Sequence, residues 1–183
     1  MRDNPSQRPR IEVPRTGPDY AGEALSLAGA LTNVWLLVLI WADLPDQTPR
    51  QFFLSLGPDA WSGRWSAVIP IGIALTMYIG LTLLKRVPHA FNYPWPITEQ
   101  NARIQYRLSR SMLTWLKAVI VWMFVAIVWS DARVAAGAAG TVSPYMIAGF
   151  LIAIHAILFG FIYRLYTFRH GDAGDRPASP GDI

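Results

Sequence analysis

The chain has 183 residues, of which 52% are hydrophobic; it contains eight Trp and no Cys, and its formal net charge is +4. The absence of cysteine excludes a disulfide framework, a thiolate metal site and thiol chemistry. In a soluble protein this positive charge would suggest a nucleic-acid partner. Here the Lys and Arg residues flank apolar runs, so membrane topology accounts for the charge and we expect no nucleic acid.

Four apolar runs dominate the sequence, each about as long as the ~20 residues that a helix needs to cross a hydrocarbon core. They predict an all-α, multi-pass transmembrane protein with four spans, at residues 21–41, 65–84, 112–129 and 145–168.

Both ends of the chain are polar. Four prolines in residues 1–20 predict an extended tail. This tail leads into a span of full length, so we do not expect a cleavable signal peptide. Residues 169–183 are rich in Gly, Pro and Asp and predict a flexible C-terminal tail.

Polar and small residues inside the spans predict how the helices pack. An amide at mid-depth seeks a partner, so Asn33 is expected to face another helix, with a ligand contact as the alternative. Gly72 and Gly80 are small enough for close packing. Lys117 is expected to extend to the inner interface through its long stem; a buried functional charge is the alternative. Glu23 near the first helix start complements the helix dipole.

The loop between the first two spans contains helix-start signals. Thr48 as N-cap and Pro49 as the first helical residue predict a short interfacial helix over residues 49–56. Its apolar side chains and the following indole are expected to reach the headgroup boundary or to cover the bundle: Phe52, Phe53 and Trp61.

The basic residues are distributed unevenly between the two sides of this topology. Twelve Lys and Arg fall on the side of both tails and of the 85–110 loop, and three fall on the other side. Such a bias predicts that the N- and C-termini are cytoplasmic, in a bacterial inner (plasma) membrane.

Residues 85–117 form the one long polar interruption between the apolar halves. Beyond Pro96 the sequence has no helix breaker, and a basic amphipathic helix is predicted from Thr98 onward. One face carries Arg103, Arg107 and Arg110. These arginines are expected to bind anionic lipid phosphates or, alternatively, acidic residues of a partner.

Part of this sequence resembles a known family. The pieces Leu44-Pro45, Gly57-Pro58-Asp59 with Trp61, and Asn92-Tyr93-Pro94 followed by Ile97-Thr98-Glu99 are similar to the bacterial membrane domain of unknown function found in SdpI-type immunity and signalling proteins. The resemblance covers about residues 41–129. It implies a small multi-pass protein without demonstrated catalysis. Where many members have His-Phe in the outer loop, this chain has Gln51-Phe52, so no metal or proton role carries over to that position.

His155 is the one ionisable residue near the centre of the fourth span. Three interpretations stand: a hydrogen-bonded structural histidine, a pigment or cofactor ligand, and a proton relay. No residue pattern specifies a cofactor, so a pigment or a lipid is the open expectation, and no metal site is predicted.

The sequence contains no nucleophile, base and orienting-residue set and no phosphate-binding loop, which favours a non-enzymatic protein. The first hypothesis is an accessory or scaffold subunit of a larger bacterial membrane complex, for example a photosynthetic reaction centre with its antenna. The second is an SdpI-like immunity or signalling protein that acts alone. A small transporter is the third; the spans show none of the paired charges that transporters use.

Overall fold

The computed structural model describes residues 8–9, 11–42, 47–49, 61–63, 67–135 and 143–169. The chain is an elongated all-α bundle of four helices: α1 (Gly17–Trp41), α2 (Val68–Leu84), α3 (Ala102–Ala135) and α4 (Pro144–Thr167). Two short strands, β1 (Gln47–Pro49) and β2 (Trp61–Gly63), pair antiparallel in the α1–α2 connection, with Gln47 opposite Gly63. A 3-10 turn, η3 (Pro88–Ala90), follows α2.

Three helices are long and apolar enough to cross a membrane: α1, α3 and α4. The fourth, α2, has 17 residues and is apolar throughout. At 1.5 Å per residue it covers about 25 Å, slightly less than a ~30 Å hydrocarbon core. The predicted all-α membrane architecture is therefore confirmed, with α2 as its shortest member.

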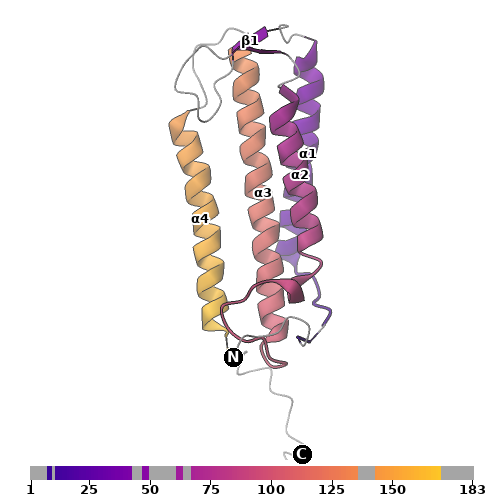
Figure 1. Ribbon diagram of the computed structural model, residues 1–183, viewed down its shortest axis with the longest axis vertical. Coiled ribbons are helices and arrows are strands. Elements are labelled where there is room, and N and C mark those ends of the chain that lie inside the picture. Colours follow the sequence, from indigo (N-terminus) through magenta and orange to yellow (C-terminus); the bar gives the residue numbers. More distant parts are fainter. Residues whose placement is uncertain are drawn as a thin grey trace, which may run out of the picture.

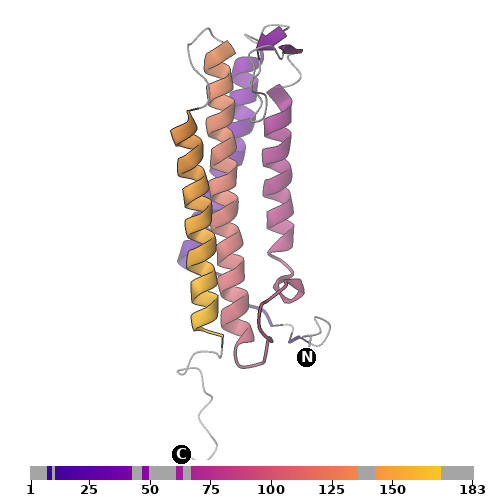
Figure 2. The ribbon, with the colours of Figure 1, turned by 60° about the vertical axis from the view of Figure 1, so that its left-hand side comes forward.

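The central element is α3, which packs against each of the other three helices, while α1 also packs against α2. Figures 1 and 2 show α3 between α4 and α2 from both viewing directions. Apolar contacts form separate clusters along it, with Leu36, Ile71 and Val128 in one half of the bundle and Ile104, Leu108 and Leu165 at the base of α4.

The helix starts differ from the sequence prediction where local capping extends a helix beyond its apolar run. α1 begins at Gly17 instead of residue 21, because Pro18 fits the first turn and the Asp19 carboxylate accepts a hydrogen bond from the Thr16 backbone N–H at 2.9 Å. α4 begins at Pro144, one residue before the predicted span, with Ser143 at the N-cap.

The predicted amphipathic helix and third span form one continuous element, α3, of 34 residues. Its first residue is Ala102, four residues after the expected cap, Thr98. A turn precedes it, in which the Ala102 N–H donates to the Thr98 carbonyl at 2.9 Å. The arginine-bearing segment therefore continues the axis of α3 and does not form a separate interfacial helix.

The outer-loop prediction is wrong at its start, because Pro49 ends strand β1 and does not begin a helix. Trp61 begins strand β2, with its backbone opposite Pro49. Residues 50–60, which include Phe52 and Phe53, lie outside the described residues.

Candidate functional site

The main polar site of the bundle joins three helices through Glu23, on the second turn of α1. Its carboxylate accepts hydrogen bonds from Lys117 of α3, with distances of 2.9 Å to Oε2 and 3.1 Å to Oε1. It also pairs with Lys85, the residue that follows α2. One carboxylate therefore pairs with two ammonium groups and holds α1, α2 and α3 together.

Hydroxyl and aromatic groups complete the surroundings of Lys117. Its Nζ donates to Thr82 Oγ1 at 2.9 Å and lies 4.7 Å from the centre of the Tyr78 ring. Thr114 Oγ1 lies 3.3 Å from Glu23 Oε1. The Lys117 side chain is 0% exposed and that of Glu23 is 23% exposed, so the cluster is closed around Lys117 and open beside Glu23.

Lys117 does not extend to the interface as its position in the sequence predicts. The acceptors Glu23 and Thr82 lie beside it on neighbouring helices, so burial with full pairing replaces solvation of the ammonium group. The expectation that the spans lack paired charges is wrong for the same reason. The signal that was present is Glu23 itself, a carboxylate in the second turn of a mostly apolar helix.

A ladder of small and polar residues continues along the α1–α3 contact. A Cβ atom at Gly22 would lie 2.8 Å from Thr114 Cγ2, and one at Gly29 would lie 2.9 Å from Val121 Cγ1. Because these two glycines have no side chain, α1 and α3 approach closely. Asn33 is fully buried next to them and donates to the Val121 carbonyl of α3 at 3.2 Å.

The glycines expected to pack, Gly72 and Gly80, are exposed on α2, and a Cβ atom on either would meet nothing within 4 Å. The prediction that Gly72 and Gly80 pack against another helix is therefore wrong, and the reason is geometric. A glycine permits close packing only where the rotation of its helix turns it towards a neighbour, and α2 presents Ile71 and Ala74 instead.

At the end of the bundle where α4 terminates, two amides from the start of α3 bind the last carbonyl groups of α4. Gln105 Nε2 donates to the carbonyls of Leu165 and Phe168, at 3.0 and 2.9 Å. Asn101 Nδ2 donates to the carbonyl of Arg169 at 2.7 Å. Carbonyl groups at a helix C-terminus lack partners within the helix, so these amides attach α4 to α3. The spacing of Asn101 and Gln105, four residues apart, is the signal that the sequence analysis missed.

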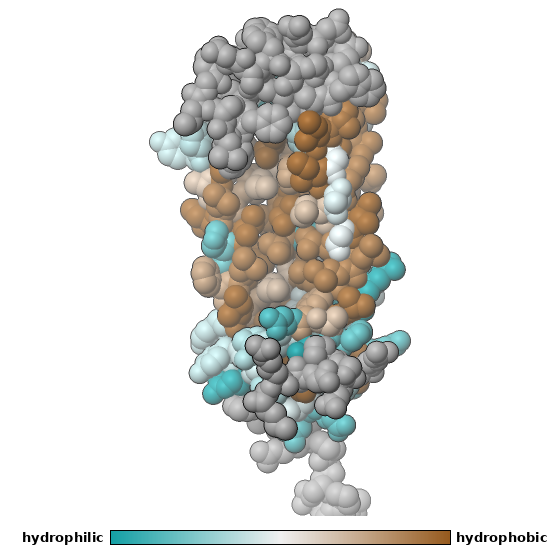
Figure 3. All heavy atoms as spheres, viewed as in Figure 1, coloured by the Kyte–Doolittle hydropathy of each residue, from teal (hydrophilic) through white to brown (hydrophobic). Residues whose placement is uncertain are grey.

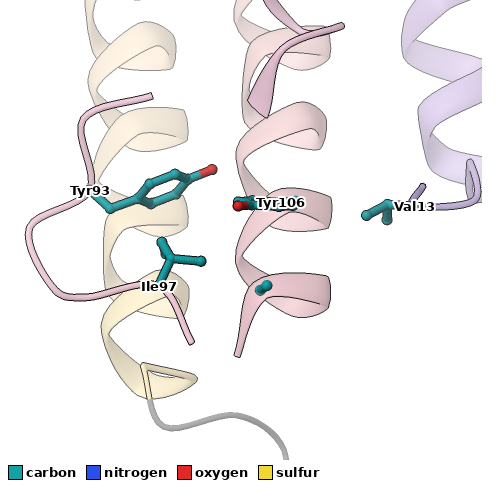
Figure 4. Packing of buried hydrophobic residues seen from close by; sticks show 5 residues of the cluster. Val13, Tyr93, Ile97 and Tyr106 are labelled. Atoms are coloured by element: carbon teal, nitrogen blue, oxygen red, sulfur yellow. The ribbon is translucent and has the colours of Figure 1, made fainter. Parts of the chain in front are cut away.

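The described residues before α1, 8–9 and 11–16, have no regular secondary structure and are packed against the protein. Val13 joins a buried cluster with Tyr93, Ile97 and Tyr106, and Figure 4 shows these side chains pointing towards one another from three parts of the chain. Tyr106 donates from its hydroxyl to the Pro9 carbonyl at 3.1 Å. Burial raises the pKa of Tyr93 to about 12.

We call this end of the molecule the basic end; it comprises residues 8–26, 80–118 and 160–169. Its described part contains ten Lys and Arg against four Asp and Glu. Hydrophilic residues gather there below an apolar belt (Figure 3). Arg103 and Arg107 are exposed on α3, whereas Arg110 is half-buried and donates to the Val13 carbonyl. The three predicted arginines therefore separate into two surface groups and one structural group.

His155 lies exposed on the outer face of α4. Its Nδ1 is 2.7 Å from the Leu151 carbonyl, and its ring lies 6.1 Å from that of Phe159. A carbonyl can only accept, so Nδ1 carries the proton and Nε2 is left as an acceptor on the apolar surface.

No family model matches the chain, and no curated protein or solved structure is significantly similar to it.

The polar groups inside the bundle form hydrogen bonds and ion pairs between helices. Within the described ranges, no group of three or more His, Cys, Asp or Glu residues could hold a metal ion. Lys117 pairs with Glu23 and is enclosed, and Thr82 and Thr114 add hydrogen bonds to the pair, an arrangement that stabilises helix contacts. Two acceptor atoms in the bundle, Asn33 Oδ1 and Gln105 Oε1, are buried without a hydrogen-bond partner.

Proposed function

We propose that this chain is a non-enzymatic accessory or scaffold subunit of a larger membrane complex in the bacterial inner membrane, with both termini cytoplasmic. One observation carries the proposal. α4 packs mainly against α3, and none of its most apolar 18-residue stretch is buried, compared with 28% for α1 and 33% for α3. A helix held to its own bundle along one side presents its other sides for packing against further helices in the membrane.

The composition of that free face supports a lateral contact with other subunits. Large side chains are exposed along it, including Ile152 at 69%, Phe159 at 67% and Tyr163 at 71%. His155 adds one hydrogen-bond acceptor to this face. In a pigment-containing assembly such as a reaction centre with its antenna, that imidazole nitrogen would face a neighbouring helix or a pigment.

Extraction from native membranes in a gentle detergent tests the proposal. We expect the chain to migrate on a native gel in a complex far larger than its own 20.4 kDa, with partner subunits identified by mass spectrometry. An absorption spectrum of the same sample tests for a pigment. Migration as a monomer or small homo-oligomer, with no partner recovered, contradicts the subunit proposal.

A second candidate is the SdpI-like immunity or signalling protein that acts alone. The segment that carries the resemblance supports it, because Tyr93 and Ile97 are ordered against α3 in a buried cluster at the basic end. Loss of resistance to a secreted toxin on deletion of the gene, with native migration as a single chain, would favour this candidate over the subunit.

A small transporter is the third candidate, and the buried Glu23–Lys117 pair supports it, since ionisable residues inside spans often mark ion pathways. Solute flux into proteoliposomes is its test. Flux that is lost in Glu23→Gln but kept in a folded control, Arg103→Gln, would favour transport. If no flux is found for a panel of ions and amino acids, the transporter candidate is rejected.

A further inference from the structure

The ion cluster at the basic end has more positive than negative charge. Glu23 contributes one carboxylate, while Lys85 and Lys117 contribute two ammonium groups. Asp19, one turn away on α1, is engaged elsewhere: it accepts hydrogen bonds from Ser111 at 2.7 Å and from Thr16. An ammonium group removed from water without a matching anion is unfavourable, and among the residues that the structure describes the cluster has no second anion.

Lys85 is the ammonium group of the cluster that can take a further anionic partner. Lys117 is satisfied by both Glu23 oxygens and by Thr82. The ammonium group of Lys85 can donate three hydrogen bonds, and in the part of the chain that the structure describes Glu23 is its one acceptor. Its side chain is 10% exposed and lies beside that of Glu23, which is 23% exposed, so the pair reaches the surface on the Glu23 side. Arg86, the next residue, is exposed and adds a second cation after the end of α2.

The surroundings of this opening are apolar. On α1, Tyr20 and Leu27 lie one turn to either side of Glu23 and are 58% and 47% exposed. On α2, Leu84 immediately precedes Lys85 and is 44% exposed. Lys85 therefore lies where the apolar surface of the bundle ends and the basic end begins, which is the depth of lipid headgroups beside a membrane protein.

We propose that Lys85 and Arg86 bind the phosphate of an anionic phospholipid, whose acyl chains lie on the exposed apolar surface of α1 and α2 beside Glu23. The lipid phosphate accepts the hydrogen bonds that Lys85 does not make within the protein and balances the second ammonium group of the cluster. The apolar flanks favour a lipid over free phosphate, because they offer burial to acyl chains and nothing to a small soluble anion.

The test uses the full-length protein, purified in a neutral detergent and depleted of lipid. Thermal unfolding is followed by tryptophan fluorescence while phosphatidylglycerol, phosphatidylcholine or inorganic phosphate is added. We expect phosphatidylglycerol to raise the apparent Tm by about 5–10 °C at roughly 100 times its Kd. Phosphatidylcholine and inorganic phosphate should raise it by much less.

Matched variants locate the site. Lys85→Gln leaves the Glu23–Lys117 pair neutral and intact, and should lose most of the phosphatidylglycerol shift, whereas Lys85→Arg should keep it. The control is Arg133→Gln, which removes one exposed cation from the last turn of α3, at the other end of the bundle, and should preserve the shift.

Three outcomes overturn the proposal. The first is an equal shift with phosphatidylcholine, which would mean an unselective lipid surface. The second is an equal shift with inorganic phosphate, which would mean a site for soluble anions. The third is a shift that persists in Lys85→Gln or disappears equally in the Arg133→Gln control, which would mean a general electrostatic effect. None of these outcomes bears on whether the chain is a subunit of a complex.

Discussion

At the scale of single residues, Glu23 is the group on which the inner part of the bundle depends. Its carboxylate pairs with Lys85 and Lys117, which come from two other parts of the chain. In a low-dielectric environment, the removal of one member of such a group leaves the others with uncompensated charge.

We therefore predict that Glu23→Gln destabilises the fold by about 3–5 kcal/mol. The double variant Glu23→Gln/Lys117→Met should recover much of this loss, because it removes the fully buried charge together with its partner. Equilibrium unfolding in mixed micelles measures both. A loss below about 1 kcal/mol in the single variant would mean that water reaches the cluster.

Tyr93 gives the basic end a dependence on alkaline pH. Its pKa is raised from 10.0 to about 12 by burial, against Tyr106 and beneath the Arg8 guanidinium, whose Cζ is 5.4 Å from the ring centre. Below pH 10 both the folded and the unfolded chain keep the phenol proton, so the contribution to stability is fully present. Between pH 10 and pH 12 the unfolded chain loses this proton while the folded chain retains it, and stability falls as the pH rises.

Unfolding midpoints measured across this window should therefore decline more steeply for the wild type than for Tyr93→Phe, which has no phenol proton to lose. Expressed as the free energy of unfolding against pH, the difference between the two slopes has an upper limit of about 1.4 kcal/mol per pH unit. Identical slopes would place Tyr93 in contact with water.

At the scale of elements, the α1–α3 contact depends on glycine at two positions. A Cβ atom at Gly29 would lie within 3.2 Å of Val121 Cγ1 and of two atoms of the Trp122 ring. We predict that Gly29→Leu separates these helices and destabilises the fold by about 1–3 kcal/mol or more.

The matched control for Gly29→Leu is Gly72→Leu, since α2 is open at Gly72 and should accept the side chain with little effect. Thermal unfolding of both variants in the same detergent tests the comparison. Equal losses would contradict the close α1–α3 contact.

The attachment of α4 depends on amide side chains from α3. Gln105→Leu keeps a similar volume but removes the hydrogen bonds to the Leu165 and Phe168 carbonyls. We expect a local loss of about 1–3 kcal/mol, seen as faster hydrogen exchange in residues 160–168 with little change in α1. Arg107→Gln, on the exposed face of the same helix, is the control and should leave this exchange unchanged.

At the scale of the whole molecule, the proposed orientation is testable because the natural chain contains no cysteine. We predict that a membrane-impermeant thiol reagent labels Ser143→Cys in intact cells and labels Arg103→Cys only after the membrane is opened. Both positions are exposed. Arg103 lies at the start of α3 and Ser143 at the start of α4, which are at opposite ends of the bundle (Figure 1). The reverse pattern would invert the topology.

The positions of the helices could be predicted from the sequence, because an apolar run of membrane-spanning length and its capping residues are local features. The start of α4 at Ser143-Pro144 is an example. The outer loop shows the limit of such signals: Thr48 and Pro49 are good helix-start residues, yet both belong to β1, where pairing with residues 61–63 outweighs local preference.

The sequence by itself determined a basic, cysteine-free chain with four apolar helices, since length, charge and hydrophobicity do not depend on how helices are turned. Only the tertiary structure decided that Gly22 and Gly29 face α3 while Gly72 and Gly80 face outward. It also decided that Lys117 meets Glu23 in the interior of the bundle. These contacts depend on the rotation of each helix about its axis, and that rotation is set by packing among helices far apart in the chain.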